Sequence, residues 1–278
     1  MSSCNKVEMI CPKCRAPQLF DDWMVVNVTL NPELKERVLN GDLLTFKCSL
    51  CRHEAPLHKP LLYSDSKKNF MVHLLHGEQP DSDITGSFPQ MHKVRLRYVD
   101  TEMQFYDKIR IFDDGLDDRI IEIEKLALFE YMHESWQVTP VDIFYQGISD
   151  DVQGGEQMGY YVVLEDGMKN IAFPYPEKYE KSVKQYAAKL PDTSCELGRW
   201  LKVDRECAKG WLAAMNLEKI RPSASTIERV DSSAQRRPSA SSITRVAPSG
   251  RRRPSASGIT RATSGSRRRR RRSRRSRR

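Results

Sequence analysis

Long apolar runs are missing from this sequence. No stretch reaches the roughly 18–20 apolar residues that a helix needs to cross a bilayer, which argues against a membrane-spanning protein. The N-terminus also lacks a charged segment followed by an apolar one, so no secretory signal is expected. The sequence therefore predicts a cytoplasmic location and no transmembrane segment.

Sequence signatures of catalysis are missing as well. There is no glycine-rich phosphate loop, no H-E-x-x-H and no G-x-S-x-G. The segment IFDDGLDD holds Asp113, Asp114, Asp117 and Asp118, but it lacks the alternating acids and distal glutamate of a calcium loop. We interpret it as a loop that ends in a helix cap, with Asp117 and Asp118 at the positive end of the following helix. No small-molecule substrate is indicated.

The C-terminal part lacks the side chains that build a core. Residues 221–278 contain no Phe, Tyr, Trp, Leu, Met or Cys, and their 19 arginines face two acids, a net charge of +17. Residues 1–220 carry 27 Lys and Arg against 35 Asp and Glu, a net charge of −8. Because ordering a chain costs roughly 1–2 kcal/mol per residue, the sequence predicts a disordered Arg/Ser-rich tail over residues 220–278.

Three 16-residue repeats make up much of this tail and place Ser223, Ser239 and Ser255 in register. In the second and third repeats, two arginines and a proline precede the serine. This resembles the substrate pattern of basophilic protein kinases, so the three serines are candidate phosphorylation sites. Duplication of a low-complexity segment without a function is the alternative explanation.

The chain ends in a run of arginines that serines interrupt. Guanidinium groups bind phosphate in a bidentate way and stay charged, so the run is predicted to bind RNA or DNA without reading its sequence. The arginines expected to contact phosphates are Arg267, Arg268, Arg269, Arg270, Arg271, Arg272, Arg274, Arg275, Arg277 and Arg278. A different acidic partner and a purely solubilising tail are the alternatives. Without aromatic side chains, the tail cannot stack on bases.

The seven cysteines include two C-x-x-C pairs, Cys11 with Cys14 and Cys48 with Cys51. Two such knuckles can supply four thiolates to one tetrahedral zinc ion, and a closed four-thiolate site is structural rather than catalytic. A redox pair, a disulfide framework and simple packing are the alternatives, but the odd total and the missing secretory signal argue against disulfides. The other cysteines show no metal pattern and are predicted to be ordinary thiols: Cys4, Cys195 and Cys207.

Local patterns predict the elements around these knuckles. Strands are expected over 23–28, 43–47, 60–63 and 70–74, and a short helix over 33–41. Asn31 is predicted to cap this helix, and Gly41 to end it. A zinc-ribbon-like domain with a helical insertion follows from this order. A further helix over 116–132 is expected to pack on the ribbon.

The residues beyond this helix predict a second, smaller unit. Residues 141–173 alternate like three strands of an antiparallel sheet, and helices over 177–189 and 195–217 are expected to follow. The last helix carries an apolar stripe at helical spacing: Trp200, Val203, Cys207, Trp211 and Met215. We interpret the stripe as core packing, with a partner-binding face as the alternative.

With these motifs the chain resembles the CpXC domain proteins. The resemblance rests on ICPKC at 10–14, the segment 23–51 that ends in KCSLC, and PLLYSD at 60–65, and it covers roughly residues 8–132. It implies that the paired cysteines are the four cysteines of the family. Arg52 stands where such knuckles often carry glycine, which makes the turn less permissive. The family brings no established activity.

The sequence thus predicts an α+β fold with three parts: residues 1–134, the ribbon domain with its trailing helix; 135–219, the small sheet with helices; and 220–278, the tail. The predicted function is that of a zinc-binding, non-enzymatic adaptor that binds an unidentified protein and, through its tail, nucleic acid. The alternative is an enzyme whose site gathers around residues 113–118. A cleft with converging acids of raised pKa would favour the enzyme, and an exposed apolar patch would favour the adaptor.

Overall fold

The computed structural model describes residues 1–80, 93–150, 155–191 and 197–215, which all lie within one compact unit, residues 1–240. The predicted tail of residues 220–278 lies outside the described residues, together with its candidate phosphorylation serines and its terminal arginines. Cys195 lies outside them too. The described part is a mixed α/β fold, as the sequence predicted.

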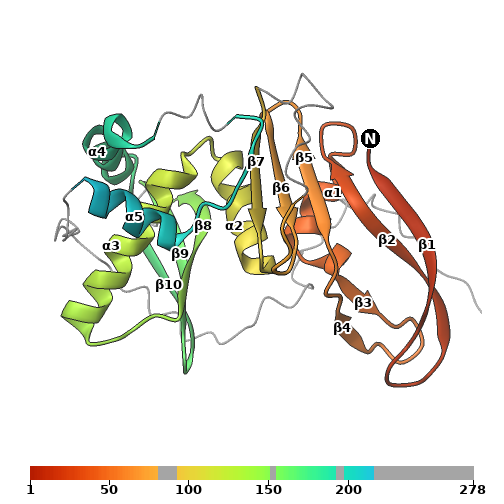
Figure 1. Ribbon diagram of the computed structural model, residues 1–278. Coiled ribbons are helices and arrows are strands. Elements are labelled where there is room, and N and C mark those ends of the chain that lie inside the picture. Colours follow the sequence, from red (N-terminus) through yellow and green to blue (C-terminus); the bar gives the residue numbers. More distant parts are fainter. Residues whose placement is uncertain (81–92, 151–154, 192–196, 216–278) are drawn as a thin grey trace, which may run out of the picture. The chain divides into compact units, whose positions relative to one another are not determined.

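The largest sheet has six strands in the order β1-β2-β5-β6-β7-β11 (Figure 1). Its strands are β1 (Ser3–Ile10), β2 (Pro17–Asn27), β5 (Leu61–Asp65), β6 (Phe70–Leu74), β7 (Arg95–Val99) and β11 (Trp200–Leu201). β1–β2 and β5–β6 pair antiparallel, whereas β2–β5, β6–β7 and β7–β11 pair parallel. The predicted strands over 23–28, 60–63 and 70–74 correspond to β2, β5 and β6.

Two smaller sheets complete the strand inventory of the described residues. β3 (Thr45–Lys47) and β4 (Glu54–Pro56) form an antiparallel hairpin beside the long β1–β2 hairpin (Figure 1). β8 (Asp142–Asp150), β9 (Glu156–Leu164) and β10 (Gly167–Tyr175) form an antiparallel sheet in the order β10-β9-β8. This second sheet confirms the three strands predicted over 141–173.

The first helix, α1 (Glu33–Leu39), buries Leu34 and Val38 as predicted, and Gly41 follows it with a φ of 75°. The predicted cap is wrong. Pro32 occupies the capping position, and its side chain has no atom that could accept a hydrogen bond. The Asn31 amide donates to the Glu33 carboxylate at 3.1 Å and does not cap the helix. A short 3-10 helix, η1 (Asp42–Leu44), replaces the start of the predicted strand over 43–47.

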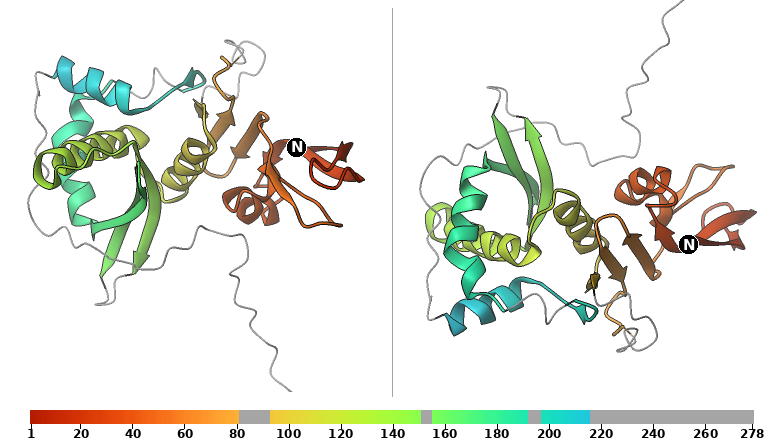
Figure 2. Two further views of the ribbon diagram at one scale, coloured as in Figure 1. Left: turned by 90° about the horizontal axis from the view of Figure 1, so that it is seen from below. Right: turned by 90° about the horizontal axis from the view of Figure 1, so that it is seen from above.

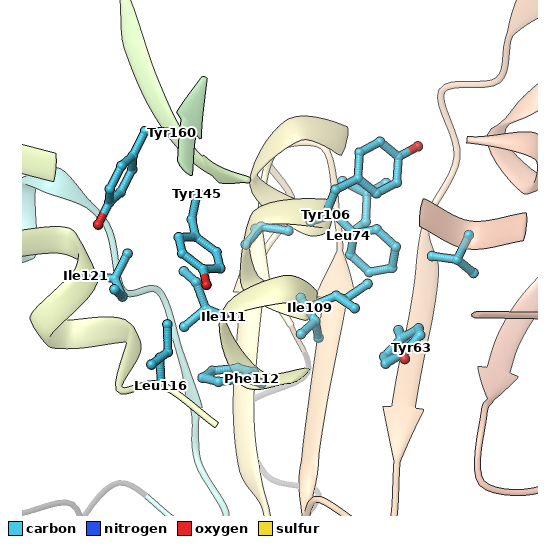
Figure 3. Packing of buried hydrophobic residues seen from close by; sticks show 14 of the residues in the cluster. Tyr63, Leu74, Tyr106, Ile109, Ile111, Phe112, Leu116, Ile121, Tyr145 and Tyr160 are labelled. Carbon is cyan, nitrogen blue, oxygen red and sulfur yellow. The ribbon is translucent and has the colours of Figure 1, made fainter. Parts of the chain in front are cut away.

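Helix α2 (Glu102–Asp113) was not predicted, and it lies at the centre of the main core. It packs against β6 and β7 of the large sheet and against β8 of the small one. Figure 3 shows Tyr63 and Leu74 on one side of α2, and Tyr145 and Ile121 on the other. A helix buried from both sides joins the two sheets, so the segments 1–134 and 135–219 share one hydrophobic cluster.

Asp117 caps helix α3 (Asp118–Trp136): its side chain accepts a hydrogen bond from the Arg119 N–H at 3.0 Å. This confirms the predicted helix cap. The predicted packing of this helix on the ribbon is wrong, because α3 packs against α2, β8 and two later helices. These are α4 (Glu177–Tyr186), which continues into the 3-10 helix η3 (Ala187–Lys189), and α5 (Arg205–Ala214). The helices α3, α4 and α5 lie near one another (Figure 2). Their apolar side chains form a second cluster around Ile120 and Ile123.

The last predicted helix is shorter than expected. Instead of one helix over 195–217, β11 at Trp200–Leu201 pairs with β7, and α5 begins only at Arg205. The predicted stripe is therefore broken: Trp200 lies in a strand beside His73, with ring centroids 5.5 Å apart and ring planes tilted by 45°. Ala208 and Leu212 form the buried face of α5. None of the helices in the described ranges is long and apolar enough to cross a membrane.

Candidate metal centre

The two C-x-x-C knuckles are the same turn built twice. Cys11 and Cys14 lie between β1 and β2, and Cys48 and Cys51 lie between β3 and β4. In the first turn the Arg15 N–H donates to the Cys11 carbonyl at 2.9 Å, and in the second the Arg52 N–H donates to the Cys48 carbonyl at 2.9 Å. Each turn therefore presents two sulfur atoms from the end of a hairpin.

Both turns need a left-handed residue after the second cysteine. Arg15 and Arg52 occupy this position with φ angles of 63° and 56°. Glycine would adopt this conformation freely, whereas arginine pays on the order of 1 kcal/mol for it. The missing glycine noted in the sequence therefore strains the turns slightly without preventing them from forming.

The two hairpins bring the four sulfur atoms within 4.8 Å of one another. Cys11 Sγ lies 3.7 Å from Cys51 Sγ, and Cys14 Sγ lies 3.6 Å from Cys48 Sγ. A disulfide would require about 2.05 Å. A tetrahedron with metal–sulfur bonds of about 2.3 Å has edges of about 3.8 Å, so the four sulfurs fit around one ion of this kind. Cys4 and Cys207 are free thiols outside the cluster, as predicted.

The electrostatics of the cluster call for a cation. The Cys51 backbone N–H is the main cause that lowers the pKa of the Cys48 thiol to about 6. The Cys51 thiol responds in the opposite direction: the His53 backbone N–H acts to lower its pKa, but burial and the neighbouring thiols raise it to about 12. The first thiolate forms easily and then opposes ionisation of its neighbours, so a cation bound among the four sulfurs would favour the fully deprotonated cluster.

Sequence reasoning missed Gln18, which lies in β2 next to the cluster. Its Nε2 donates to Cys48 Sγ at 2.7 Å, and its Oε1 accepts from the Ser49 N–H at 2.9 Å. One side chain from the first hairpin thus holds the second knuckle through both ends of its amide. No spacing rule links residue 18 to residue 48, so only the tertiary structure reveals this contact.

We expect the substitution Gln18→Leu to weaken metal retention by roughly 10–100-fold, the usual effect of losing an outer-shell hydrogen bond. Gln18→Glu should weaken it as well, because a carboxylate cannot donate to the thiolate and adds a negative charge. Competition with a chelator, followed by metal release, measures the effect. Gln79→Leu, which removes an amide acceptor used by Tyr98 elsewhere, is the matched control and should retain the metal as wild type does.

A small apolar cluster supports the site. Cys11, Cys48 and Phe46 are buried, and Phe20 and Phe46 have ring centroids 6.3 Å apart. Other apolar side chains of the same region face solvent: Ile10 is 64% exposed, Leu19 75% and Leu50 73%. The cysteine-bearing hairpins therefore enclose a small apolar cluster and also expose three large apolar side chains.

The four aspartates of residues 113–118 do not converge. Asp113 pairs with Lys35 and Lys68, and Asp114 accepts from the Tyr145 hydroxyl at 2.6 Å. Asp117 caps α3, as described above. Asp118 lies in the first turn of α3, at the positive end of the helix as predicted, and is fully buried there. An enzyme site centred on these acids is therefore not supported by their positions.

Asp118 instead belongs to a buried ladder of alternating charge. Arg97 Nε donates to Asp118 at 2.7 Å, Lys108 Nζ donates to Glu122 at 2.7 Å, and Lys108 lies 3.7 Å from Asp118. Lys125 continues the ladder by donating to Glu122 at 2.9 Å and to Asp107 at 2.7 Å. All six side chains are at most 7% exposed. Three cations thus balance three anions inside the protein.

The ladder shifts the titration of its acids in different directions. Burial acts to raise the pKa of Asp118, but the Arg97 guanidinium holds it well below its usual range. The pKa of Asp107 is raised, because burial outweighs the attraction of Lys125. Asp107 and Lys125 also line a cleft between α2, α3, β8 and the start of α5. An acid of raised pKa therefore lies in a cleft, but this cleft is not formed by the aspartates of residues 113–118.

Comparison with known proteins gives a family for the N-terminal half. Residues 9–125 match the family model described as CpXC protein, and both cysteine pairs lie inside the match. This confirms the resemblance predicted from the sequence over these residues. Searches of curated proteins and of solved structures gave no match.

Proposed function

We propose that the four cysteines bind one Zn²⁺ ion as a structural centre and that β1–β4 form a zinc-ribbon-like arm. The single observation that carries this is the pair of sulfur–sulfur distances of 3.6 and 3.7 Å, close to the edge of a zinc–thiolate tetrahedron. With all four positions taken by thiolates, the ion has no open position for a substrate. Zinc here would supply folding energy, not chemistry.

The arm supports an adaptor role for the described residues. Zinc would lock together two hairpins that share only a small apolar cluster, and in doing so it would fix the exposed side chains of Ile10, Leu19 and Leu50. A rigid apolar patch loses little entropy when a partner covers it. We therefore place the contact with a protein partner on this arm.

For the tail, outside the described residues, we propose non-specific binding to RNA or DNA. Its charge of +17 against −8 for residues 1–220 supports this assignment. Phosphate groups would attract the ten arginines from Arg267 to Arg278 and would be repelled by the acidic body. Phosphorylation of Ser223, Ser239 and Ser255 would add roughly −1.5 to −2 charges each and weaken the attraction.

The full-length protein is expected to bind RNA and DNA with little sequence preference and with a steep dependence on salt. The logarithm of the affinity should fall by roughly 0.7–0.9 per neutralised phosphate as the logarithm of the salt concentration rises. Removing residues 266–278 should flatten this slope, and fluorescence anisotropy over a salt series measures it. If the protein lacking residues 221–278 binds as tightly as the full chain, the nucleic-acid site lies in the body and the tail assignment is wrong.

An enzyme is the second candidate function, and the cleft beside Asp107 is the observation that favours it. Burial raises the pKa of Asp107 and also that of Asp142, which lines the same cleft. Acids with raised pKa values in a cleft are typical of catalytic sites, although buried ion-pair networks shift pKa values too. Any reaction there first requires a bound small molecule, so the ligand of the cleft decides this candidate.

A further inference from the structure

The cleft between α2, α3, β8 and the start of α5 holds a cavity of about 130 Å³. A single water occupies roughly 10–15 Å³ of such space, so the cavity has room for on the order of ten non-hydrogen atoms. Val99, Ile143, Phe144 and Val203 supply its apolar lining. The remaining lining residues are mostly charged. Its size is that of a small metabolite, and its surface mixes apolar and ionic groups.

The floor of the cavity is rigid and balanced in charge. Lys108 and Lys125 each donate to Glu122, and Lys125 also donates to Asp107. The backbone N–H of Tyr145 donates to the other oxygen of Asp107. Every one of these side chains is at most 7% exposed. Because these groups satisfy one another, a ligand meets a preformed floor and does not have to order it.

Of the other charged lining residues, Lys202 pairs with Asp204, and Glu206 pairs with Lys209. Two lining residues, Asp142 and Arg205, have no such partner among the described residues. The Asp142 carboxylate accepts from the adjacent Ile143 N–H at 2.9 Å, but it forms no ion pair with any described residue. The Arg205 guanidinium lies over the Phe129 ring, 4.8 Å from its centroid, and likewise forms no ion pair within the described ranges. Arg205 is close enough to lower the pKa of Asp142, yet the two do not touch. One free acceptor and one free cation therefore face the same space.

The signs of these charges limit the class of ligand. Because the floor is balanced in charge, Asp142 and Arg205 set the preference of the cavity, and Asp142 would repel a polyanion. A bare metal ion fits poorly as well: among the described residues, the four cysteines are the group close enough together to hold one, and the acids of the cavity are not. A molecule with one group of each charge satisfies Arg205 and Asp142 together.

We propose that this cleft binds a free amino acid or a closely similar small zwitterion. The Arg205 guanidinium would hold the carboxylate through two parallel hydrogen bonds, and the Asp142 carboxylate would accept from the ammonium group. The side chain of the ligand would rest on Ile143, Phe144 and Val203. This inference goes beyond the adaptor function, because it needs neither the metal nor the tail.

Titration of the full-length protein with the individual standard L-amino acids, followed by calorimetry, tests the proposal. We expect at least one to bind. Its N-acetyl derivative, which lacks the ammonium group, and its carboxamide, which lacks the carboxylate, should each bind at least about tenfold more weakly, because a charged hydrogen-bonding partner is left buried and unpaired. These comparisons use the unaltered protein, so they do not depend on a variant that folds.

Two variants assign the contacts to residues. Asp142→Asn should lower the affinity for the free amino acid at least about tenfold, but it should not lower the affinity for the N-acetyl derivative any further. Arg205→Gln should likewise lower the affinity for the free amino acid and leave that for the carboxamide unchanged. Lys184→Gln, which removes an exposed ion pair with Glu180 away from the lining of the cavity, is the control and should leave the affinity unchanged. If no amino acid binds the unaltered protein, or if both variants retain full affinity, the assignment of the cleft is wrong.

Discussion

Replacing Cys48 with serine is expected to release the metal ion and to melt the arm formed by β1–β4. The wild-type protein should contain about one zinc per chain by elemental analysis. Structural zinc contributes roughly 10–16 kcal/mol of apparent binding free energy in small domains that fold around it, far more than these short hairpins can gain from Phe20 and Phe46 alone. Removing one of the four thiolates should therefore leave most of the arm disordered.

Amide hydrogen exchange of the purified variant measures this loss region by region. Exchange should accelerate in residues 3–24 and 45–56 and change much less in α1, α2 and α3, because those helices contribute to the main core. Cys4→Ser is the matched control, since Cys4 is an exposed thiol outside the cluster. A wild-type protein that is free of metal and yet keeps a fully protected arm would contradict the structural role of zinc.

Replacing Asp118 with asparagine should lower the free energy of unfolding by roughly 3–5 kcal/mol, because it removes the carboxylate that accepts two hydrogen bonds from the buried Arg97 guanidinium. This is a large part of the roughly 5–15 kcal/mol that stabilises a typical domain. Urea denaturation at neutral pH measures the loss. Asp21→Asn, which removes an exposed ion pair with Lys6, is the control and should cost at most about 1 kcal/mol.

The double variant Arg97→Met with Asp118→Leu separates the cost of breaking this buried ion pair from the cost of losing the packing of its side chains. Replacing both members of a buried pair by apolar side chains is often neutral, so the double variant should be more stable than Asp118→Asn alone. If the double variant is equally unstable, the ladder acts through more than this pair. An Asp118→Asn protein as stable as wild type would show that the pair contributes nothing.

Lowering the pH should remove the stabilisation that the Asp118 carboxylate provides. The pKa of Asp118 is held below its unfolded value of about 3.9 by Arg97, so its contribution is complete above about pH 5 and is lost as the pH falls through the folded pKa. The difference in stability between wild type and Asp118→Asn should therefore narrow as the pH drops below about 4.

The sequence alone determined the cysteine cluster, because its signal is local. Two C-x-x-C pairs can each turn two sulfurs toward one point whatever surrounds them, and the structure brings both pairs together. The hairpin of β5 and β6 and the sheet of β8–β10 were predicted for a similar reason. Strand alternation and turn residues are visible over a few positions, and pairing between neighbours in sequence follows from them.

Only the tertiary structure determined that charged side chains of α2 are buried. Its sequence, EMQFYDKIRIFD, carries charged residues on several faces, and a helix with such residues is expected at the surface. Asp107 and Lys108 are nevertheless buried, because α3 brings Glu122 and Lys125 against them, and β7 brings Arg97 to Asp118. A charge can enter a core when an opposite charge meets it there, and that partner can lie at any distance along the chain. The contact of Gln18 with Cys48, the pairing of β11 with β7, and the position of Asp142 and Arg205 in one cleft are further examples. Each depends on contacts between segments that are far apart in the sequence, and no local sequence pattern predicts such contacts.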